Sequence, residues 1–208
     1  MNYFAFFITR FWVVWNTILA ILPYGFWSLA QYYKTKKIPI AYWVNIFLMV
    51  LFLPNSIYLT TDIIHIFGSI PESFYGFGGD PSLLYSYFDF GSINFGWAYN
   101  TIMVFLFFLG MYLFWDQGKL LFKEFKLNTI SKLIFFSLIA YGVYLGRFVR
   151  LNSWDIFVDF TGFLNQLKPS FHGVVFIVYF TIFEVVSYYL LDFLNRTQNL
   201  EKIGKTLN

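Results

Sequence analysis

Two arginines one helical turn apart, Arg147 and Arg150, close a long apolar run of the sequence. A guanidinium group is a planar fork that suits carboxylate or phosphate, and charged groups at membrane depth usually face the interior of a helix bundle. We therefore expect both arginines to point inward, toward an anionic ligand or a protein carboxylate; anchoring to lipid phosphates is the alternative. Further hydrogen-bonding residues follow at once: Asn152, Ser153, Trp154 and Asp155. The candidate protein carboxylates are Asp62, Asp89 and Asp155.

A second polar group follows Pro54 in the stretch LPNSIYLTTDIIHI. Proline removes one backbone donor and tends to kink a helix. If the helix continues beyond it, side chains three and four residues apart share one face. The row formed in this way is Asn55, Tyr58, Asp62 and His65. It brings together an amide, a phenol, a carboxylate and an imidazole, and it predicts a lined pocket; a kinked span with an ordinary polar end is the alternative.

Two of these residues, Asp62 and His65, are also spaced as two ligands of one metal ion, although a full site needs more ligands. The residues that could complete such a site are Asp89, Asp155 and His172. A divalent metal ion is thus the one candidate cofactor. In an enzyme, Asp62 or Asp155 would act as general base and His65 as proton shuttle, while the arginines would stabilise phosphate charge. Walker, GxSxG, HExxH and dinucleotide motifs are missing from the sequence.

Two further carboxyls have alternative interpretations. Asp89 precedes an apolar segment, where it would cap a helix or pair with Arg147. Glu184 lies near the middle of the last apolar segment, where an ionised carboxyl is expensive. We expect a neutral acid that hydrogen-bonds to another helix; a proton or cation relay is the alternative. The candidate partners are Asn16, Asn45 and Asn100.

The composition predicts that these residues belong to a single integral membrane domain over residues 1–208. The chain is 59% hydrophobic and only 12% charged, whereas soluble domains carry about 25% charged residues. A soluble core of this length could not hide so much apolar surface. The absence of cysteine excludes disulfides and thiolate chemistry. The small net charge of +3, with dispersed basic residues, gives no support to nucleic-acid binding.

Five stretches are long and apolar enough to cross a bilayer, which takes about 20 residues. They are residues 11–30, 40–59, 95–115, 133–149 and 174–194. Each should be a helix, because hydrocarbon cannot satisfy backbone hydrogen bonds, so the predicted fold is an all-α transmembrane bundle. Ten of the 14 basic residues fall in two loops and the C-terminal tail on one side, which predicts an outside N-terminus and an inside C-terminus. Residues 60–94 then form a long extracytoplasmic loop that could dip into the membrane interface.

Three segments, LPNSIYLTTDIIH, YFDF and LGRFVRLNSWD, together resemble a bacterial membrane family catalogued as domain of unknown function 1361. The matching residues are Pro54, Asn55, Tyr58, Thr61, Asp62 and His65, then Asp89, then Gly146, Arg147, Arg150, Asn152, Ser153, Trp154 and Asp155. The resemblance runs from the second predicted span to the fifth; the first span and Glu184 draw no support from it. It implies a multi-pass protein of a bacterial cell membrane and no established activity.

Three functions fit these residues. The first is a transport or accessory component that binds a small anion, or a lipid or polyprenyl headgroup, in an outward-facing pocket. Its ligand-binding residues would be Asn55, Tyr58, Asp89, Arg147, Arg150, Asn152 and Trp154. The second is an intramembrane enzyme that acts on a lipid headgroup or lipid-linked precursor at the outer face. The third is a structural subunit that docks with a partner membrane protein.

Overall fold

The computed structural model describes residues 3–63, 95–150 and 170–206, together with positions 158, 161, 164 and 167. Side chains are described over 13–63, 101–150 and 170–198, and at the same four positions. The regular elements in this part of the chain are all helical. They are α1 (Tyr3–Thr35), α2 (Pro39–Phe52), α3 (Pro54–Thr61), α6 (Phe95–Phe125), α7 (Thr129–Tyr144), the π-helical turn η2 (Leu145–Val149) and α10 (Phe171–Thr206).

Five helical segments are long and apolar enough to cross a membrane. They are Val13–Thr35, Pro39–Thr61, Thr101–Phe125, Thr129–Val149 and Phe171–Gln198. The predicted all-α class and the five helices of spanning length are thereby confirmed, with ends shifted by several residues, and they indicate a multi-pass membrane protein. The second span consists of α2 and α3, and the fourth consists of α7 and η2. The outside N-terminus stays a prediction, and residues 64–94 of the predicted long loop lie outside the described residues.

Short turns with fixed backbone geometry connect the helices that are described on both sides. Lys37, with φ 57°, precedes Pro39 at the start of α2, and Lys126, with φ 49°, follows α6. A left-handed residue after a helix satisfies the last carbonyls and reverses the chain. Asn128 then caps α7, because its side chain accepts a hydrogen bond from the Ser131 backbone N–H at 2.8 Å. These turns place α1 against α2 and start α7 beside the end of α6.

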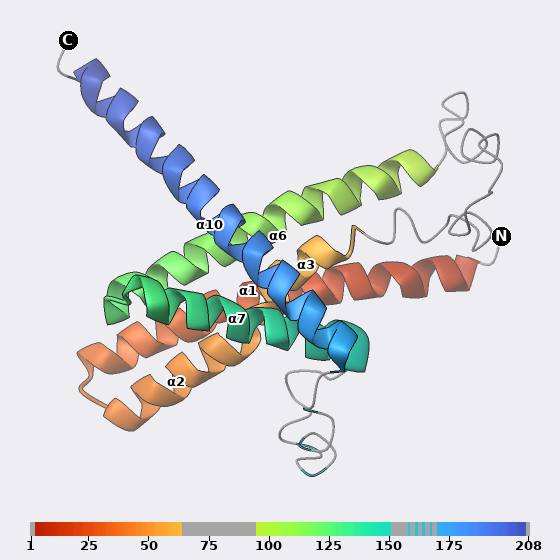
Figure 1. Cartoon of the computed structure of the whole chain (residues 1–208), viewed down its shortest axis with the longest axis horizontal. Helices are drawn as coiled ribbons and strands as arrows, with labels where there is room; N and C mark the ends of the chain where they lie inside the picture. The colour runs from red at the N-terminus through yellow and green to blue at the C-terminus, as the bar shows by residue number, and fades with distance from the viewer. Residues whose placement is uncertain are drawn as a thin grey trace.

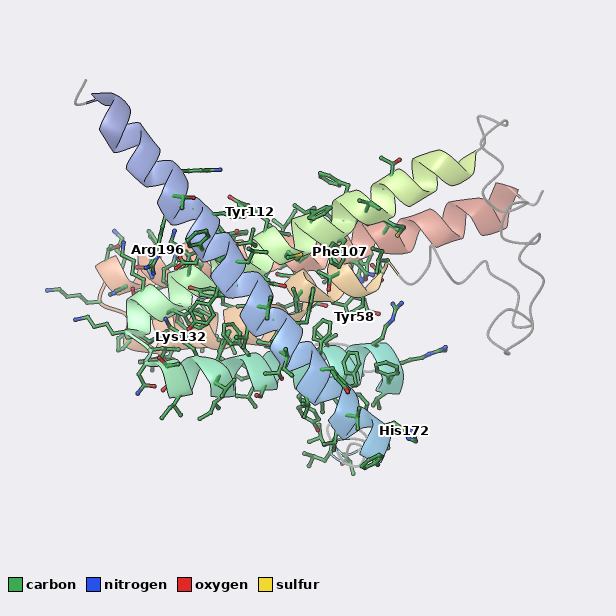
Figure 2. The ribbon with its side chains drawn as sticks, turned by 45° about the horizontal axis from the view of Figure 1, so that its top comes forward. Tyr58, Phe107, Tyr112, Lys132, His172 and Arg196 are labelled. Atoms are coloured by element: carbon green, nitrogen blue, oxygen red, sulfur yellow. The ribbon has the colours of Figure 1, made fainter. Side chains whose placement is uncertain are left out.

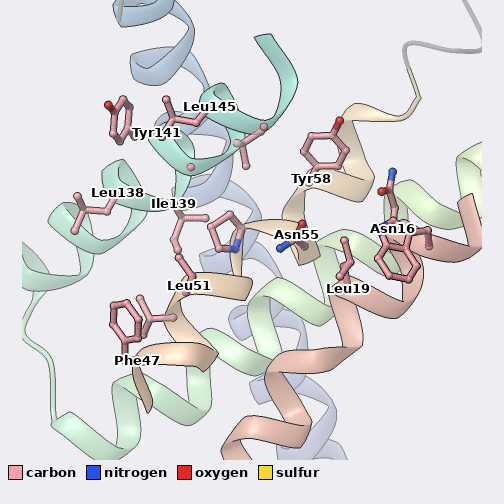
Figure 3. A pocket seen from close by; sticks show the side chains of 16 residues that line it. Asn16, Leu19, Phe47, Leu51, Asn55, Tyr58, Leu138, Ile139, Tyr141 and Leu145 are labelled. Carbon is pink, nitrogen blue, oxygen red and sulfur yellow. The ribbon is translucent and has the colours of Figure 1, made fainter. Parts of the chain in front are cut away.

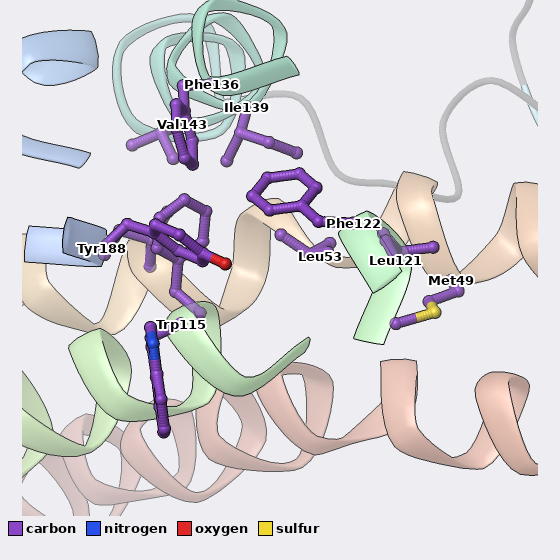
Figure 4. Packing of buried hydrophobic residues seen from close by; sticks show 11 residues of the cluster. Met49, Leu53, Trp115, Leu121, Phe122, Phe136, Ile139, Val143 and Tyr188 are labelled. Carbon is purple, nitrogen blue, oxygen red and sulfur yellow. The ribbon is translucent and has the colours of Figure 1, made fainter. Parts of the chain in front are cut away.

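Helices α1, α2, α6 and α7 run roughly along one direction, and α10 crosses them obliquely. Figure 1 shows α1 and α2 as an antiparallel pair, α3 against α6, and α10 crossing α6 and α7. The core lies at this crossing, where aromatic rings from three helices meet (Figure 4). The ring centroid of Phe122 lies 5.6 Å from that of Phe136 and 5.2 Å from that of Tyr188. The core therefore joins α10 to α6 and α7.

The outer surface of the spans is apolar as well. Large side chains that point away from the core include Phe105 and Leu138, each 62% exposed, and Phe193, 63% exposed. Soluble monomers rarely expose contiguous apolar patches of this kind. A bilayer matches them, which agrees with the five spans.

A close helix contact joins α3 to α6 at Gly110. A Cβ atom at this glycine would lie 2.8 Å from the Ser56 carbonyl oxygen and 3.0 Å from Leu59 Cβ. Small residues allow such backbone approach in membranes, where dispersion and hydrogen bonds drive helix association. Gly110 thus sets the spacing of the two helices.

A buried polar network accompanies this contact. The Ser56 hydroxyl lies 2.6 Å from Gln117 Oε1 and 2.9 Å from the Ala20 carbonyl oxygen. Gln117 Nε2 donates to the same carbonyl at 2.8 Å. Both side chains are fully buried, so the network fixes α1, α3 and α6 relative to one another.

Candidate binding site

The break between α2 and α3 positions the first polar residues of the site. Pro54 lacks a backbone N–H, so α2 ends at Phe52 and α3 begins at Pro54. Asn55 stabilises the break, since its Nδ2 donates to the Phe52 carbonyl at 2.9 Å. On the other side, the Pro54 ring fits against Gly142 of α7, where a Cβ atom would lie 2.8 Å from Pro54 Cγ.

Arg147 lies at the centre of a polar cluster beyond this break. Its Nη1 lies 3.2 Å from Asp62 Oδ1 and 3.3 Å from the Tyr58 hydroxyl, and its Nη2 donates to the Thr61 carbonyl at 3.2 Å. The guanidinium carbon also lies 5.6 Å from the centre of the Tyr58 ring. The side chains of Arg147 and Asp62 are 15% and 2% exposed. The pair is therefore largely removed from solvent.

Asn16 of α1 completes this cluster, which we define as Asn16, Tyr58, Thr61, Asp62 and Arg147. Asn16 Nδ2 donates to Asp62 Oδ2 at 3.2 Å, so both carboxylate oxygens accept hydrogen bonds. The cluster thus joins α1, the end of α3 and η2. From the sequence, Asn16 was expected only as a partner of Glu184. Its role could have been predicted from its position, because it lies in the same half of its span as the polar row that begins at Asn55.

The two arginines do not share a helical face. Arg147 lies within the π-helical turn, which ends at Arg150 with φ 63°. The Arg150 side chain is exposed and forms no hydrogen bond or ion pair with the residues the structure describes, while its backbone N–H donates to the Leu145 carbonyl. The expectation that both arginines point inward therefore holds for Arg147 and is wrong for Arg150. A π-helical turn within a span is itself a frequent feature of functional sites.

A cavity of about 320 Å³ adjoins the cluster. It lies between α1, α2, α3 and the α7–η2 segment (Figure 3). Most of its wall is apolar, and Asn16, Asn55 and Tyr58 provide polar groups near the cluster. None of the described residues that line it is Asp, Glu, Lys or Arg. Asn16 and Tyr58 connect the charged pair to the cavity, because both line the cavity and each contacts one member of the pair.

Five predicted site residues lie outside the described residues: His65, Asp89, Asn152, Trp154 and Asp155. His172 is exposed at the start of α10, away from Tyr58 of the cluster (Figure 2). Among the residues whose placement is described, no three His, Asp or Glu side chains are grouped as metal ligands. Asp62 instead contacts Arg147 and Asn16. The described geometry therefore assembles an ion pair at Asp62, and the metal site stays an untested prediction.

Glu184 lies in the core away from this site. Its side chain is completely buried, and neither carboxyl oxygen has a hydrogen-bond partner in the described part of the chain. Two of the expected partners bond elsewhere: Asn16 donates to Asp62, and Asn45 donates to the Ala41 carbonyl at 2.8 Å. The side chain of Asn100 lies outside the described residues.

Replacing Glu184 by methionine is expected to raise the free energy of unfolding by about 1–3 kcal/mol, because a buried polar group without a partner carries that penalty. Thermal unfolding in detergent measures the change. Glu184→Gln is the matched control, since it keeps the shape and the polarity and should bring no gain. A methionine variant less stable than wild type would show that the carboxyl has a stabilising partner.

No curated protein and no solved structure matches this chain. Residues 15–187 match the model of a family described as a protein of unknown function, DUF1361. The matched range includes the motifs around Pro54, Asp89 and Arg147, and it extends over Glu184 and most of the first span. The resemblance drawn from the motifs is thereby confirmed. The five candidate spans indicate a multi-pass membrane protein, and the chain belongs to the DUF1361 family of proteins of unknown function.

Proposed function

We propose that this protein is a membrane-embedded binding component that holds an anionic group, a phosphate or carboxylate, in an outward-facing polar site as part of a transport or accessory system. The observation that carries this proposal is the polar end of the cavity, where Asn16 and Tyr58 line the cavity and also contact the buried Arg147–Asp62 pair. The predicted orientation of the spans places this end outside.

Two hydrogen-bond donors are available to such a ligand. The Tyr58 hydroxyl accepts from Arg147, and its own hydrogen has no acceptor among the described residues. Asn16 Nδ2 donates one of its two hydrogens to Asp62, and the second can donate to a ligand. Because hydrogen bonds polarise one another in a low dielectric, the contact with Arg147 makes the Tyr58 hydroxyl a stronger donor. Both groups suit the oxygens of a phosphate or carboxylate.

The enzyme alternative has less support from the described residues. Asp62, the candidate general base, accepts hydrogen bonds at both oxygens and does not line the cavity. A base must reach the proton that it abstracts. The structural alternative is supported by one observation, which is that the cluster joins α1, α3 and η2. The variants of Arg147 described in the Discussion distinguish this role from ligand binding.

Replacing Tyr58 by phenylalanine tests the proposed site, since it removes one donor and keeps the ring. A hydrogen bond to a charged group contributes roughly 1.5–3 kcal/mol, so binding of inorganic phosphate should weaken by about tenfold or more. Isothermal titration calorimetry on the full chain in detergent measures the affinity. The matched control is Tyr179→Phe, at a tyrosine of α10 that is 70% exposed. Equal binding by both variants and the wild type would reject the proposed site.

A further inference from the structure

The cavity beside the polar cluster opens sideways through the surface of the spans. Residues at its rim are exposed: Trp15 is 41% exposed, Phe47 53%, Val50 36% and Leu138 62%. Its inner wall is buried, as at Val143 with 0% exposure. The exposed rim belongs to α1, α2 and α7, within segments that are apolar enough to cross a membrane. The opening therefore faces bilayer hydrocarbon.

We propose that the ligand of this site is a phosphate-bearing membrane lipid, whose hydrocarbon chain enters the cavity from the bilayer while its headgroup reaches Asn16 and Tyr58. This inference rests on the proposed function and specifies the source of the anionic group. An apolar cavity does not retain water, and a void next to hydrocarbon loses dispersion contacts until a chain fills it.

The cavity wall is apolar at one end and polar at the other, as a lipid has an apolar chain and a polar headgroup. Phe47 and Leu51 form the apolar end, and Asn55 and Tyr58 form the polar end (Figure 3). From Phe47 in α2 to Tyr58 in α3, across the break at Leu53, the chain advances at most about 16.5 Å at 1.5 Å per helical residue. One leaflet of the hydrocarbon core is about 15 Å thick. The length of the cavity wall thus corresponds to a chain of a single leaflet, the outer one in the predicted orientation.

The contact between Pro54 and Gly142 fixes the width of this cavity. Both residues line it, and a Cβ atom at Gly142 would lie 2.8 Å from Pro54 Cγ. The close approach holds α3 and α7 together on the inner side of the cavity, so the opening toward the bilayer is the side through which a chain can enter.

The experiment uses the full chain in detergent with three probes: phosphatidylglycerol that carries a diazirine in one acyl chain, diacylglycerol with the same chain, and inorganic phosphate. Native mass spectrometry counts bound lipid, and photocrosslinking locates the chain. Val50→Trp fills the rim of the cavity. Its matched control is Val44→Trp on the same helix, at a valine that is 50% exposed and does not line the cavity.

We expect one phosphatidylglycerol per chain and crosslinks on residues that line the cavity. Diacylglycerol, which lacks the headgroup, and phosphate, which lacks the acyl chain, should each bind about tenfold more weakly. Val50→Trp should reduce phosphatidylglycerol binding by about tenfold, and Val44→Trp should leave it unchanged. Phosphate that binds as tightly as the lipid, together with unchanged binding in Val50→Trp, would overturn the lipid inference and leave the proposed anion site standing. Lipid and phosphate binding that is insensitive to Tyr58→Phe would overturn both.

Discussion

Replacing Arg147 by alanine is expected to lower the free energy of unfolding by more than about 2 kcal/mol. The variant leaves the Asp62 carboxylate, whose side chain is 2% exposed, without its counter-ion, and breaking a buried pair from one side typically costs about 3–5 kcal/mol. Arg147 itself is 15% exposed, which places the expected loss toward the lower part of this range. Thermal or denaturant-induced unfolding in detergent measures it.

Arg150 provides the matched control for this prediction. It is exposed and has no ion pair with any residue described, so Arg150→Ala should change stability by less than about 0.5 kcal/mol. A melting temperature of Arg147→Ala equal to that of the wild type would contradict the pairing. The double variant Arg147→Met with Asp62→Leu should recover most of the stability, because replacing both charges with apolar groups removes the desolvation cost.

The same variants separate a structural role from a binding role. If the cluster only holds α1, α3 and η2 together, the double variant restores the protein in every assay. If the cluster supports a ligand, the double variant is stable and still fails to bind inorganic phosphate or phosphatidylglycerol. Arg147→Lys adds a second comparison, since one ammonium cannot reproduce the contacts of a planar fork.

Replacing Gly110 by alanine is the second change for which we expect a large effect. The new Cβ atom would lie 2.8 Å from the Ser56 carbonyl oxygen, so the backbone of α3 or α6 must move. Overpacking of this kind costs about 1–3 kcal/mol. The displacement would also disturb the Ser56–Gln117 network, whose hydroxyl-to-amide distance is 2.6 Å. Thermal unfolding in detergent should show a clear loss.

Gly25 of α1 is the control, because a Cβ atom there would meet nothing within 4 Å. Gly25→Ala should be neutral or stabilising by up to about 1 kcal/mol, as glycine is the weaker helix former. Equal stability of the two alanine variants would mean that α3 and α6 tolerate a wider spacing than the structure shows.

Helical spacing explains which parts of the site were predictable from the sequence. Asn55, Tyr58 and Asp62 lie on one local face, and the periodicity that predicted their row depends only on residues three and four apart. The five spans were predictable for a similar reason, since length and hydropathy are properties of continuous segments. The structure places Tyr58 and Asp62 with Arg147.

Contacts between helices were less accessible to sequence reasoning. The Asn16–Asp62 contact joins residues 46 positions apart, and its formation depends on how α1 and α3 are rotated about their axes. Arg150 was placed on the wrong face because the spacing assumed a continuing α-helix, whereas the chain turns left-handed at that residue. The expected partner of Glu184 depended on the same unknown rotations.

The π-helical turn has a consequence for the evolution of this site. Such a turn holds one residue more than an α-helical turn, so a deletion of Gly146 would close it into an ordinary α-helix. One residue of an α-helix corresponds to a rotation of about 100°, and Arg147 would then swing away from Asp62 by that angle. Chain length, and not only residue identity, would decide which side chain meets the carboxylate. Homologues that keep both charged residues but lack the inserted residue would not form this ion pair.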